Sequence, residues 1–313
     1  MNKIDFRNAF FDEMYSLANK NKNLVFLTGD ISAHSLPKFQ KKFPSRFYNL
    51  GVAEQNMITV ATGLAMNKKK VFVFSMIPFL TMRCFEHIKI DICSHNLPIV
   101  LIGIGSGLSY DTDGHSAQAI FDIGIMRMLP ELEIYNPSDP ISAKKICKIV
   151  STSKRPSYVR LDKSQQVSIY NERENFNANF KIFGNNSKNC IISSGIMTHK
   201  CLILKKELMK KNINLEIMDL IKIKPINESK LIQKLKKYKN IFIVDENTFS
   251  GGISSILSEI FIKNKFYKNI NFYCLKNTQD VGCYGNRDWL QKRNNIDFNH
   301  LIKSITNIIK KND

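Results

Sequence analysis

Short apolar runs alternate with segments of helical periodicity through the first 165 residues. The apolar runs predict strands at Leu24–Thr28, Val71–Ser75, Ile99–Ile104, Glu133–Tyr135 and Ser157–Leu161. The periodic segments predict helices at Phe6–Ala18, Glu54–Met66, Met82–Cys93, Ala117–Met128 and Ile141–Val150. Apolar strands that alternate with helices are typical of an α/β protein with a mostly parallel sheet.

The same alternation restarts after a polar segment rich in Asn, Ser and charged residues. The later strands are predicted at Cys190–Ser193, Asn214–Asp219 and Ile241–Glu246, and the helices at His199–Lys211, Glu228–Tyr238 and a segment ending near Ile262. We therefore predict two domains, 1–165 and 190–313, joined by a linker at 166–189. The predicted fold class is α/β, with two open, mostly parallel sheets that carry helices on both faces. Ligands bind such sheets at the carboxyl ends of strands, which singles out the loops after Thr28, Ser75 and Ile104.

Composition narrows the class of protein. The formal net charge is +19, but the lysines are dispersed and form no stripe with interleaved aromatic residues, which argues against nucleic-acid binding. No apolar run reaches the roughly 18 residues of a membrane span, and the first residues are too polar for a signal peptide. The seven cysteines occur singly, which is typical of reduced thiols in a cytoplasmic protein and predicts neither a disulfide framework nor a metal site on this chain.

Two segments offer polar side chains at predicted strand ends. Glu54 begins an apolar helix, where a carboxylate taken alone is more often a helix cap than a catalytic group. The glycine-rich segment Gly103–His115 offers Asp111, Asp113 and His115, and a solvated turn is an equal alternative there.

A third segment follows the strand Val71–Ser75. Phe79 lies in the loop after that strand, where an aromatic residue usually belongs to the core. Arg83 and Glu86 are spaced three residues apart in the predicted helix, which predicts a surface ion pair.

The order of these segments resembles the second half of transketolase over nearly the whole chain. Gly51–Met57 (GVAEQNM) is similar to that family's GIAEQNM motif, and Ser109–Pro130 resembles its D-G-x-T-H segment with the later D and R-x-x-P. Further matches occur in the same order at Ser45–Asn49, Ala61–Ala65, Asn136–Asp139, Arg155–Ser157, Lys224–Pro225 and Glu246–Gly252. Each motif alone is weak, but their order and spacing are specific.

The resemblance implies a thiamine diphosphate-dependent transferase that moves a two-carbon ketol unit from a ketose, expected as a phosphate, to an aldose. Glu54 would be the catalytic acid, because in the family this glutamate hydrogen-bonds the pyrimidine ring and favours its imino tautomer. Phe79 would stack on the pyrimidine, and Asp30 would lie near the cofactor. We expect an apolar, water-poor pocket around Glu54 that keeps its carboxyl group protonated.

The resemblance also implies substrate contacts. Arg7 and Lys163 match positions that contact a sugar phosphate, and Asp113 matches the residue that meets a substrate hydroxyl. Two family histidines are absent, because their positions are Gly105 and Ala117 here, and we expect His115 to replace part of their role. These departures predict poor activity on the usual pentose phosphates and better activity on a less common ketose, such as a branched or deoxy sugar.

The family's diphosphate-binding domain, with its GDG…N metal motif, is not found in this sequence. The one Gly-Asp pair, Gly29-Asp30, falls in the pyrimidine-type domain. The resemblance therefore implies the C-terminal subunit of a split transketolase, active only with an N-terminal diphosphate-binding subunit that holds Mg²⁺ or Ca²⁺. We expect a self-associating heterotetramer with two copies of each chain. Alternatives are a 1-deoxyxylulose-phosphate synthase-like subunit, the β subunit of a 2-oxo acid dehydrogenase decarboxylase, or a non-catalytic scaffold paralogue.

Overall fold

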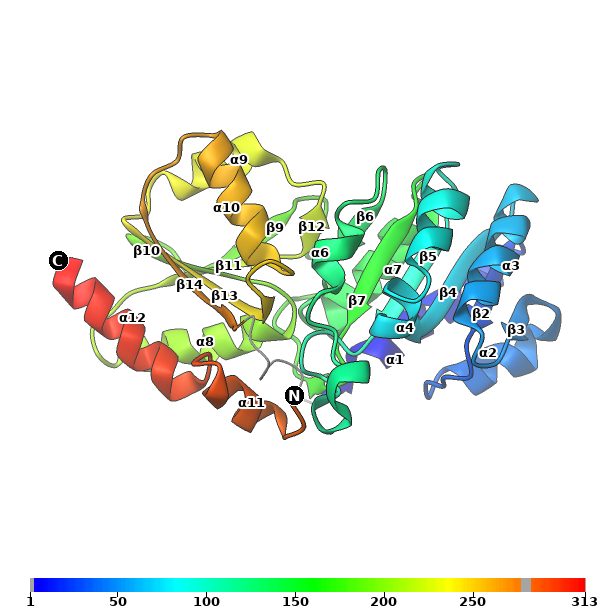
Figure 1. The fold of residues 1–313 in the computed structure, drawn as a ribbon, viewed down its shortest axis with the longest axis horizontal. Helices are drawn as coiled ribbons and strands as arrows, with labels where there is room; N and C mark the ends of the chain where they lie inside the picture. The colour runs from blue at the N-terminus through cyan, green and yellow to red at the C-terminus, as the bar shows by residue number, and fades with distance from the viewer. Residues whose placement is uncertain (1–2, 277–282, 313) are drawn as a thin grey trace.

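Two α/β lobes lie side by side in the computed structural model, which describes residues 3–276 and 283–312 (Figure 1). The first lobe is built on a seven-stranded sheet and the second on a five-stranded sheet. Both sheets are mostly parallel and are covered by helices on both faces, so the predicted fold class is confirmed. A two-stranded antiparallel ribbon, β1 (Ile4–Asp5) with β8 (Gln165–Gln166), joins the two ends of the first lobe's sequence.

The first sheet contains β2 (Leu24–Thr28), β3 (Phe47–Asn49), β4 (Lys70–Met76), β5 (Val100–Ile104), β6 (Glu133–Tyr135), β7 (Ser157–Leu161) and β12 (Lys222–Lys224). Their order across the sheet is β12-β6-β7-β5-β4-β2-β3, and every neighbouring pair is parallel except β12 with β6. The carboxyl ends of β2, β4 and β5 therefore lie next to one another. These are the strands whose following loops the sequence singles out.

Helices cover both faces of this sheet, which explains why its strands are continuous apolar runs. One face packs against α1 (Phe6–Lys20), α2 (Leu36–Lys42) and α7 (Pro140–Thr152), and the other against α3 (Glu54–Met66), α4 (Ile77–Thr81) and α6 (Asp122–Met126). Within β2, Leu24 and Phe26 join the first core while Val25 and Leu27 join the second. Short helical turns complete the lobe at Pro44–Arg46, Phe85–His87 (α5), Ile88–Cys93 and Asp111–Ser116.

The second sheet has the order β14-β13-β10-β11-β9. Its strands are β9 (Phe180–Phe183), β10 (Asn189–Ser193), β11 (Glu216–Leu220), β13 (Asn240–Thr248) and β14 (Asn269–Leu275). Its helices are α8 (Ile196–Met209), α9 (Glu228–Leu235), α10 (Ile253–Lys263), α11 (Arg287–Arg293) and α12 (Phe298–Asn312). α9 and α10 pack on one face of the sheet, while α8 and α12 pack on the other.

Two strands have positions that the hydrophobic pattern does not predict. β12 comes from the second half of the chain but pairs antiparallel with β6 of the first sheet. β9 lies inside the segment predicted as a linker, yet it pairs antiparallel with β11 and so belongs to the second sheet. The predicted domain boundaries at 165 and 190 stay a prediction.

Two predicted helices of the first lobe differ from those observed. Instead of the single helix predicted at Met82–Cys93, the structure has α4, which begins five residues earlier with Pro78 in its first turn. A break then separates α4 from α5 and from the helical turn Ile88–Cys93. The helix predicted at Ala117–Met128 is shortened to α6, because Ala119 instead pairs with the backbone of Ser106 and Gly107. Both differences lie at the carboxyl edge of the sheet, where loops depart from helical periodicity.

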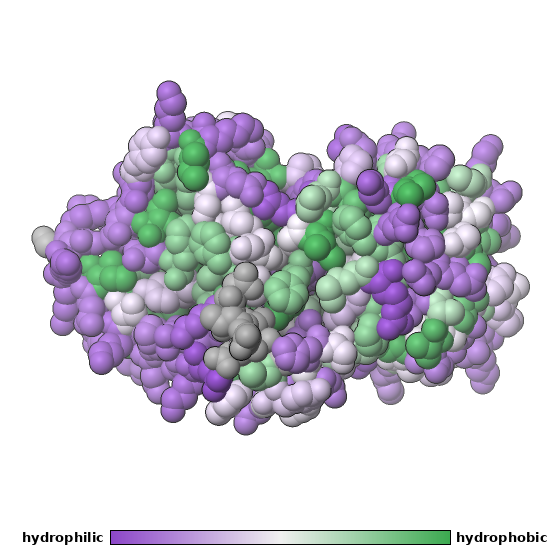
Figure 2. Space-filling model, in the orientation of Figure 1, coloured by the Kyte–Doolittle hydropathy of each residue, from purple (hydrophilic) through white to green (hydrophobic). Residues whose placement is uncertain are grey.

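The surface seen in Figure 2 is hydrophilic around the outer rims of both lobes, and apolar residues gather toward the middle of the face. Several of the many lysines pair with acids of the same chain, as Lys144 does with Glu172 and Lys263 with Glu228. No helix among the described residues is both long and apolar enough to cross a membrane.

A buried ion pair lies where α6 meets the second lobe. Asp122 accepts hydrogen bonds from Arg160 at 2.5 and 3.0 Å and from the Tyr158 hydroxyl at 2.7 Å. Asn247 of β13 contacts both members of the pair, at 3.4 Å from Asp122 and 3.2 Å from Arg160. Arg160 and Asp122 are each only 2% exposed, so neither charge can be solvated by water if its partner is lost.

Replacing Asp122 with alanine should lower the free energy of unfolding by about 3–5 kcal/mol, because it leaves the Arg160 guanidinium buried and unpaired. The measurement is urea unfolding of the purified chain. Glu207→Ala is the control, since its pair with Lys210 lies on an exposed helix face and should cost under about 1 kcal/mol. An equal loss of unfolding free energy in the two variants would show that the buried ion pair stabilises the fold no more than the exposed one.

Candidate active site

The residues predicted to act on cofactor and substrate lie along one edge of the first sheet. Asp30 follows β2, Glu54 follows β3 and Phe79 follows β4. Asp113 and His115 follow β5, and Lys163 follows β7. Because β3, β2, β4, β5 and β7 are consecutive and parallel, their carboxyl ends meet at the same edge of the sheet.

Glu54 is the first residue of α3 and is 2% exposed. Its Oε1 accepts a hydrogen bond from the Ser75 hydroxyl at 3.2 Å, and its Oε2 pairs with Nη1 of Arg83 at 2.6 Å. Neither bond goes to a backbone amide of α3, so the carboxylate does not cap this helix. A buried carboxylate needs such partners, because leaving it without them is costly.

Arg83 contacts Glu54 and Phe79 at the same time. Its guanidinium carbon lies 4.5 Å from the centroid of the Phe79 ring, within the range of a cation–π contact. Phe79 is on α4, is partly exposed, and belongs to none of the buried clusters among the described residues. The ring, the guanidinium and the carboxylate thus form a contiguous set of three at the carboxyl end of β4.

Two sequence-based expectations about this set are wrong. Arg83 does not pair with Glu86, because the helix is broken at this point and the side chain instead reaches the buried carboxylate of Glu54. The carboxyl oxygens of Glu54 also do not lie in an apolar pocket, since a hydroxyl and a guanidinium group contact them.

Asp30 is held by Asn49 at the end of β3. The backbone amide of Asp30 donates to Oδ1 of Asn49 at 3.0 Å, and Nδ2 of Asn49 donates to Oδ1 of Asp30 at 3.2 Å. The same Asn49 oxygen accepts from the amide of Gly51 at 3.1 Å. Asn49 therefore ties the loop of Asp30 to the turn that precedes Glu54.

Arg7 joins the start of α1 to the loop after β2. Its Nη1 donates to the carbonyl oxygen of Ser32 at 3.0 Å, and its Nη2 pairs with Asp5 at 3.2 Å. The Nε atom is buried and has no hydrogen-bond partner among the described residues. One donor of this guanidinium group thus remains unused.

Lys163 lies near Arg7, because Asp5 and Gln165 pair in the ribbon of β1 and β8. The Lys163 amide donates to the Ser109 hydroxyl at 3.0 Å, and its Nζ lies 4.4 Å from the centroid of the Tyr110 ring. The two cations predicted to contact a phosphate are therefore on the same side of the site.

Asp113 and His115 lie in the helical turn Asp111–Ser116, and both are exposed. Between them Gly114 has φ +71°, and a Cβ atom there would collide with the ring of Tyr284 from the second lobe. The turn thus places both polar side chains in solvent while its glycine packs against the second lobe. The structure brings the candidates together in a cofactor group (Asp30, Glu54, Phe79) and a substrate group (Arg7, Asp113, His115, Lys163), and their roles stay predictions.

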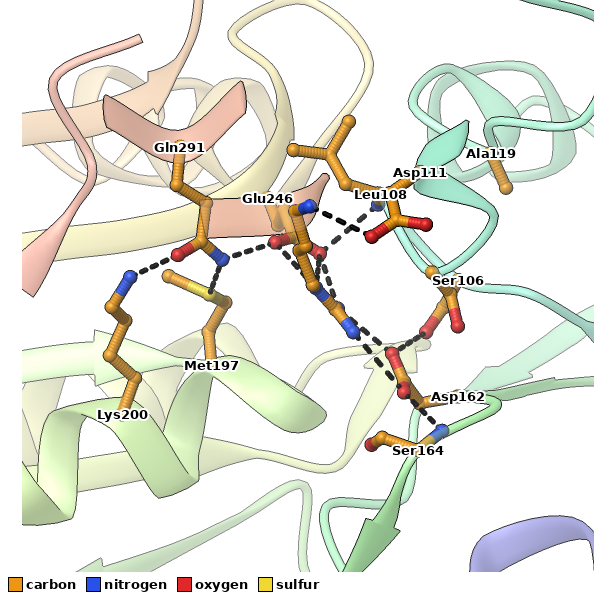
Figure 3. A network of polar contacts seen from close by, with 12 residues as sticks. Ser106, Leu108, Asp111, Ala119, Asp162, Ser164, Met197, Lys200, Glu246 and Gln291 are labelled. Carbon is orange, nitrogen blue, oxygen red and sulfur yellow. Dashed lines mark hydrogen bonds and ion pairs between the residues drawn. The ribbon is translucent and has the colours of Figure 1, made fainter. Parts of the chain in front are cut away.

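Arg287 of α11 is the centre of a polar network that fixes the loops of the substrate group. Figure 3 shows Asp162, Glu246, Leu108 and Asp111 of this network. The Arg287 guanidinium binds Asp162, beside Lys163, at 2.9 and 3.3 Å, and Glu246 of β13 at 2.5 to 3.1 Å. Glu246 also accepts from the amide of Leu108, and Asp111 accepts from the amide of Arg287 at 2.8 Å. One arginine therefore connects both lobes with two loops of the site.

The charges in this network depend on one another. Burial opposes ionisation of Asp162, but the charge and hydrogen bonds of Arg287 outweigh it and hold the pKa of that carboxyl below its usual value. Because this pKa is lowered in the folded state, the pair stabilises the fold above the usual aspartate range of about 3.9. That stabilisation is lost as the pH falls through the lowered pKa.

Sequence reasoning misses Arg83 and Arg287 as parts of the site. The available signal is their residue type, because this chain has only nine arginines against 37 lysines. A composition so biased toward lysine makes each arginine informative, since only arginine provides a planar set of donors that can bind two acids at once.

Arg287→Met should make the loop at 105–118 more mobile and should lower the free energy of unfolding. Removing the guanidinium leaves Asp162 and Glu246 buried without a cation, which should cost about 3 kcal/mol. Hydrogen exchange should then be faster at the amide of Leu108, and the thermal midpoint should fall. Lys292→Met, an exposed change on the same helix, is the control, and equal exchange in the two variants would contradict the role of Arg287.

Several known proteins are similar to this chain over most of its length. It is 30% identical over 309 residues to a putative transketolase C-terminal section of Methanocaldococcus jannaschii, covering 97% of this chain and 96% of the relative. It is 28% identical over 255 residues to an apulose-4-phosphate transketolase subunit of Actinobacillus succinogenes, covering 81% and 82%. A solved structure described as a split gene transketolase, inactive beta4 tetramer, superposes with a TM-score of 0.85 at 25% identity, covering 98% of both chains.

The chain also matches two domain families. Residues 2–167 match the transketolase pyrimidine binding domain, and residues 180–299 match the transketolase C-terminal domain. The two matched segments coincide with the seven-stranded and five-stranded sheets except for β12, which crosses to the first sheet. The chain therefore belongs to the transketolase family, and it carries that family's pyrimidine-binding and C-terminal domains.

Proposed function

We propose that this chain is the C-terminal subunit of a two-chain, thiamine diphosphate-dependent transketolase. The observation that carries the proposal is the position of Arg83, whose flat, N–H-bearing guanidinium lies on the ring of Phe79 and binds the carboxylate of Glu54. Phe79 and Glu54 thus bind a planar group that carries N–H donors, through its face and its edge respectively. An aminopyrimidine ring is also planar and carries nitrogen atoms at its edge, so the same two residues are suited to bind it. Asp30 lies beside the pair, because Asn49 joins its loop to the turn before Glu54.

The residues of the cofactor group have separate tasks in this proposal. When bound, thiamine diphosphate supplies the carbon nucleophile that cleaves a bond beside the ketone of the sugar. Oε2 of Glu54 would hydrogen-bond the pyrimidine nitrogen, and the Ser75 hydroxyl keeps Oε1 oriented toward β4. Phe79 provides an apolar ring face that orients the pyrimidine and excludes water from one side. Arg83 must leave Glu54 for this arrangement to form.

A partner subunit would complete the site. The sequence offers no motif for binding the diphosphate and its Mg²⁺ or Ca²⁺, so we assign both to an N-terminal subunit. Two of the similar proteins support this division, because one is named as a C-terminal section and the other as one subunit of a transketolase. Two copies of each chain would form a closed, twofold assembly. We place the complex in the cytoplasm, since all seven cysteines are free thiols.

The substrate group is suited to a phosphorylated sugar. Arg7 and Lys163 provide cations, Asp113 provides an acceptor for a sugar hydroxyl, and His115 is exposed on the same turn. The absence of side-chain donors at Gly105 and Ala117 favours a ketose other than the usual pentose phosphates. A relative that is named for apulose 4-phosphate supports a branched sugar phosphate as the first substrate to test.

The test of the proposed function is reconstitution with a diphosphate-domain subunit and assay of ketol transfer with a panel of ketose phosphates. The pair should be active with thiamine diphosphate and Mg²⁺, and Glu54→Gln should reduce kcat by about 10²-fold or more while the subunits still assemble. Glu86→Gln is the matched control on the neighbouring segment and should retain full activity. Near-normal turnover by the Glu54→Gln pair would contradict the role assigned to this carboxyl group.

Arg83 gives a second test, which needs no turnover. If its guanidinium competes with the pyrimidine for Glu54 and Phe79, Arg83→Met should tighten thiamine diphosphate binding by the reconstituted pair on the order of 10-fold, because the competing internal contact is removed. Isothermal calorimetry at saturating Mg²⁺ measures the effect, with Lys89→Met as the control. Weaker binding by Arg83→Met would show instead that the arginine supports the bound cofactor.

A further inference from the structure

Tyr110 fills the space that a side chain at position 105 would need. Gly105 has φ +98°, and a Cβ atom there would overlap the ring carbons of Tyr110. The resemblance to transketolase implies a histidine at this position, where the chain has glycine. The ring of Tyr110, five residues later in the same loop, therefore occupies the space next to Gly105 in which a side chain at that position would lie.

The surroundings of Tyr110 are strongly charged. Lys163 Nζ lies 4.4 Å from the ring centroid. Burial raises the pKa of the Tyr110 hydroxyl, Arg7 lowers it, and Asp113 and Asp5 raise it further, so both the cation and the acids lie close to this group. The net effect raises the pKa of the hydroxyl, which therefore stays protonated and can donate a hydrogen bond.

The hydroxyl of Tyr110 has no hydrogen-bond partner among residues 3–276 and 283–312. The buried tyrosines of the chain behave differently, because Tyr158, Tyr170 and Tyr238 each donate to a carboxylate at 2.6 to 2.7 Å. Arg7 also has an unpaired donor, since its buried Nε has no hydrogen-bond partner in the described part of the chain. Within the described part of the chain, two donors without partners thus occur on Arg7 of the substrate group and on Tyr110, on whose hydroxyl Arg7 acts electrostatically.

We infer that Tyr110 is a specificity-determining residue whose hydroxyl donates a hydrogen bond to the terminal phosphate of the sugar, alongside Arg7 and Lys163. The inference rests on the proposed function and adds to it the residue that selects a phosphorylated sugar end. A phosphate is bound strongly by charge-assisted hydrogen bonds from cations, and a neutral hydroxyl donor near them can add a further bond. Tyr110 thereby takes over a contact for which position 105 has no side chain.

The test is Tyr110→Phe in the reconstituted complex, because this change removes only the oxygen and keeps the ring against Gly105 and Lys163. Steady-state kinetics are measured with a ketose phosphate and with the same ketose lacking its phosphate. The KM of the phosphorylated sugar should rise about 10-fold, as for loss of a hydrogen bond to a charged group, with kcat unchanged. The KM of the unphosphorylated sugar and the thermal midpoint should not change. Tyr267→Phe, at an exposed position outside the site, is the control.

The inference is overturned if Tyr110→Phe leaves both KM values unchanged, or if it raises them equally, since the hydroxyl would then not contact the phosphate. A binding measurement separates this outcome from failure of the proposed function. Calorimetric titration of the complex with ribose 5-phosphate and with ribose requires no turnover. Weaker binding of the phosphate by Tyr110→Phe in a complex without ketol transfer would support the contact and reject the transketolase activity.

Discussion

The Arg287 guanidinium, with Asp162 on one side and Glu246 on the other, is the interaction on which the geometry of the site depends. Asp162 directly follows β7 of the first sheet and Glu246 lies near the end of β13 of the second, so one cation holds the carboxyl edges of both sheets together. The Leu108 amide donates to Glu246, and the Arg287 amide donates to Asp111. These two bonds fix the middle of the glycine-rich segment. The second lobe contributes none of the predicted catalytic groups, yet it determines where the loop carrying Asp113 and His115 can lie.

The cofactor group is arranged around a different arginine. Arg83 neutralises a carboxylate that would otherwise be buried alone, and its stacking on Phe79 keeps the ring face covered. In this structure the Glu54 carboxylate is thus paired within the chain. In the proposed complex the same two contacts pass to the pyrimidine ring, so that cofactor binding replaces an internal ligand instead of filling an empty cavity. In the proposal, this exchange is the physical reason why the cofactor group would act only in the complex.

The sequence pattern predicted the strands well where burial of apolar side chains alone determines the local structure. The strands at Leu24–Thr28 and Ser157–Leu161 were predicted with their observed bounds, because burial on both faces demands continuous apolar residues. The carboxyl edge of the sheet, and hence the neighbourhood of Glu54 and Phe79, also followed from strand order. Contacts between distant segments could not be predicted, such as β12 joining the first sheet or Arg287 reaching Asp162 across 125 residues. The ring of Tyr110 over Gly105 belongs to the same class, since no periodicity encodes the packing of a loop on itself.

The most direct test of a divided thiamine diphosphate site is a structure of the reconstituted complex with the cofactor and Mg²⁺ bound. We expect the pyrimidine ring on the face of Phe79, with a ring nitrogen within hydrogen-bond distance of the Glu54 carboxyl group and the Arg83 guanidinium displaced from both. The diphosphate and the metal should contact only the partner chain. A pyrimidine ring bound elsewhere, with Arg83 still paired to Glu54, would contradict the central claim.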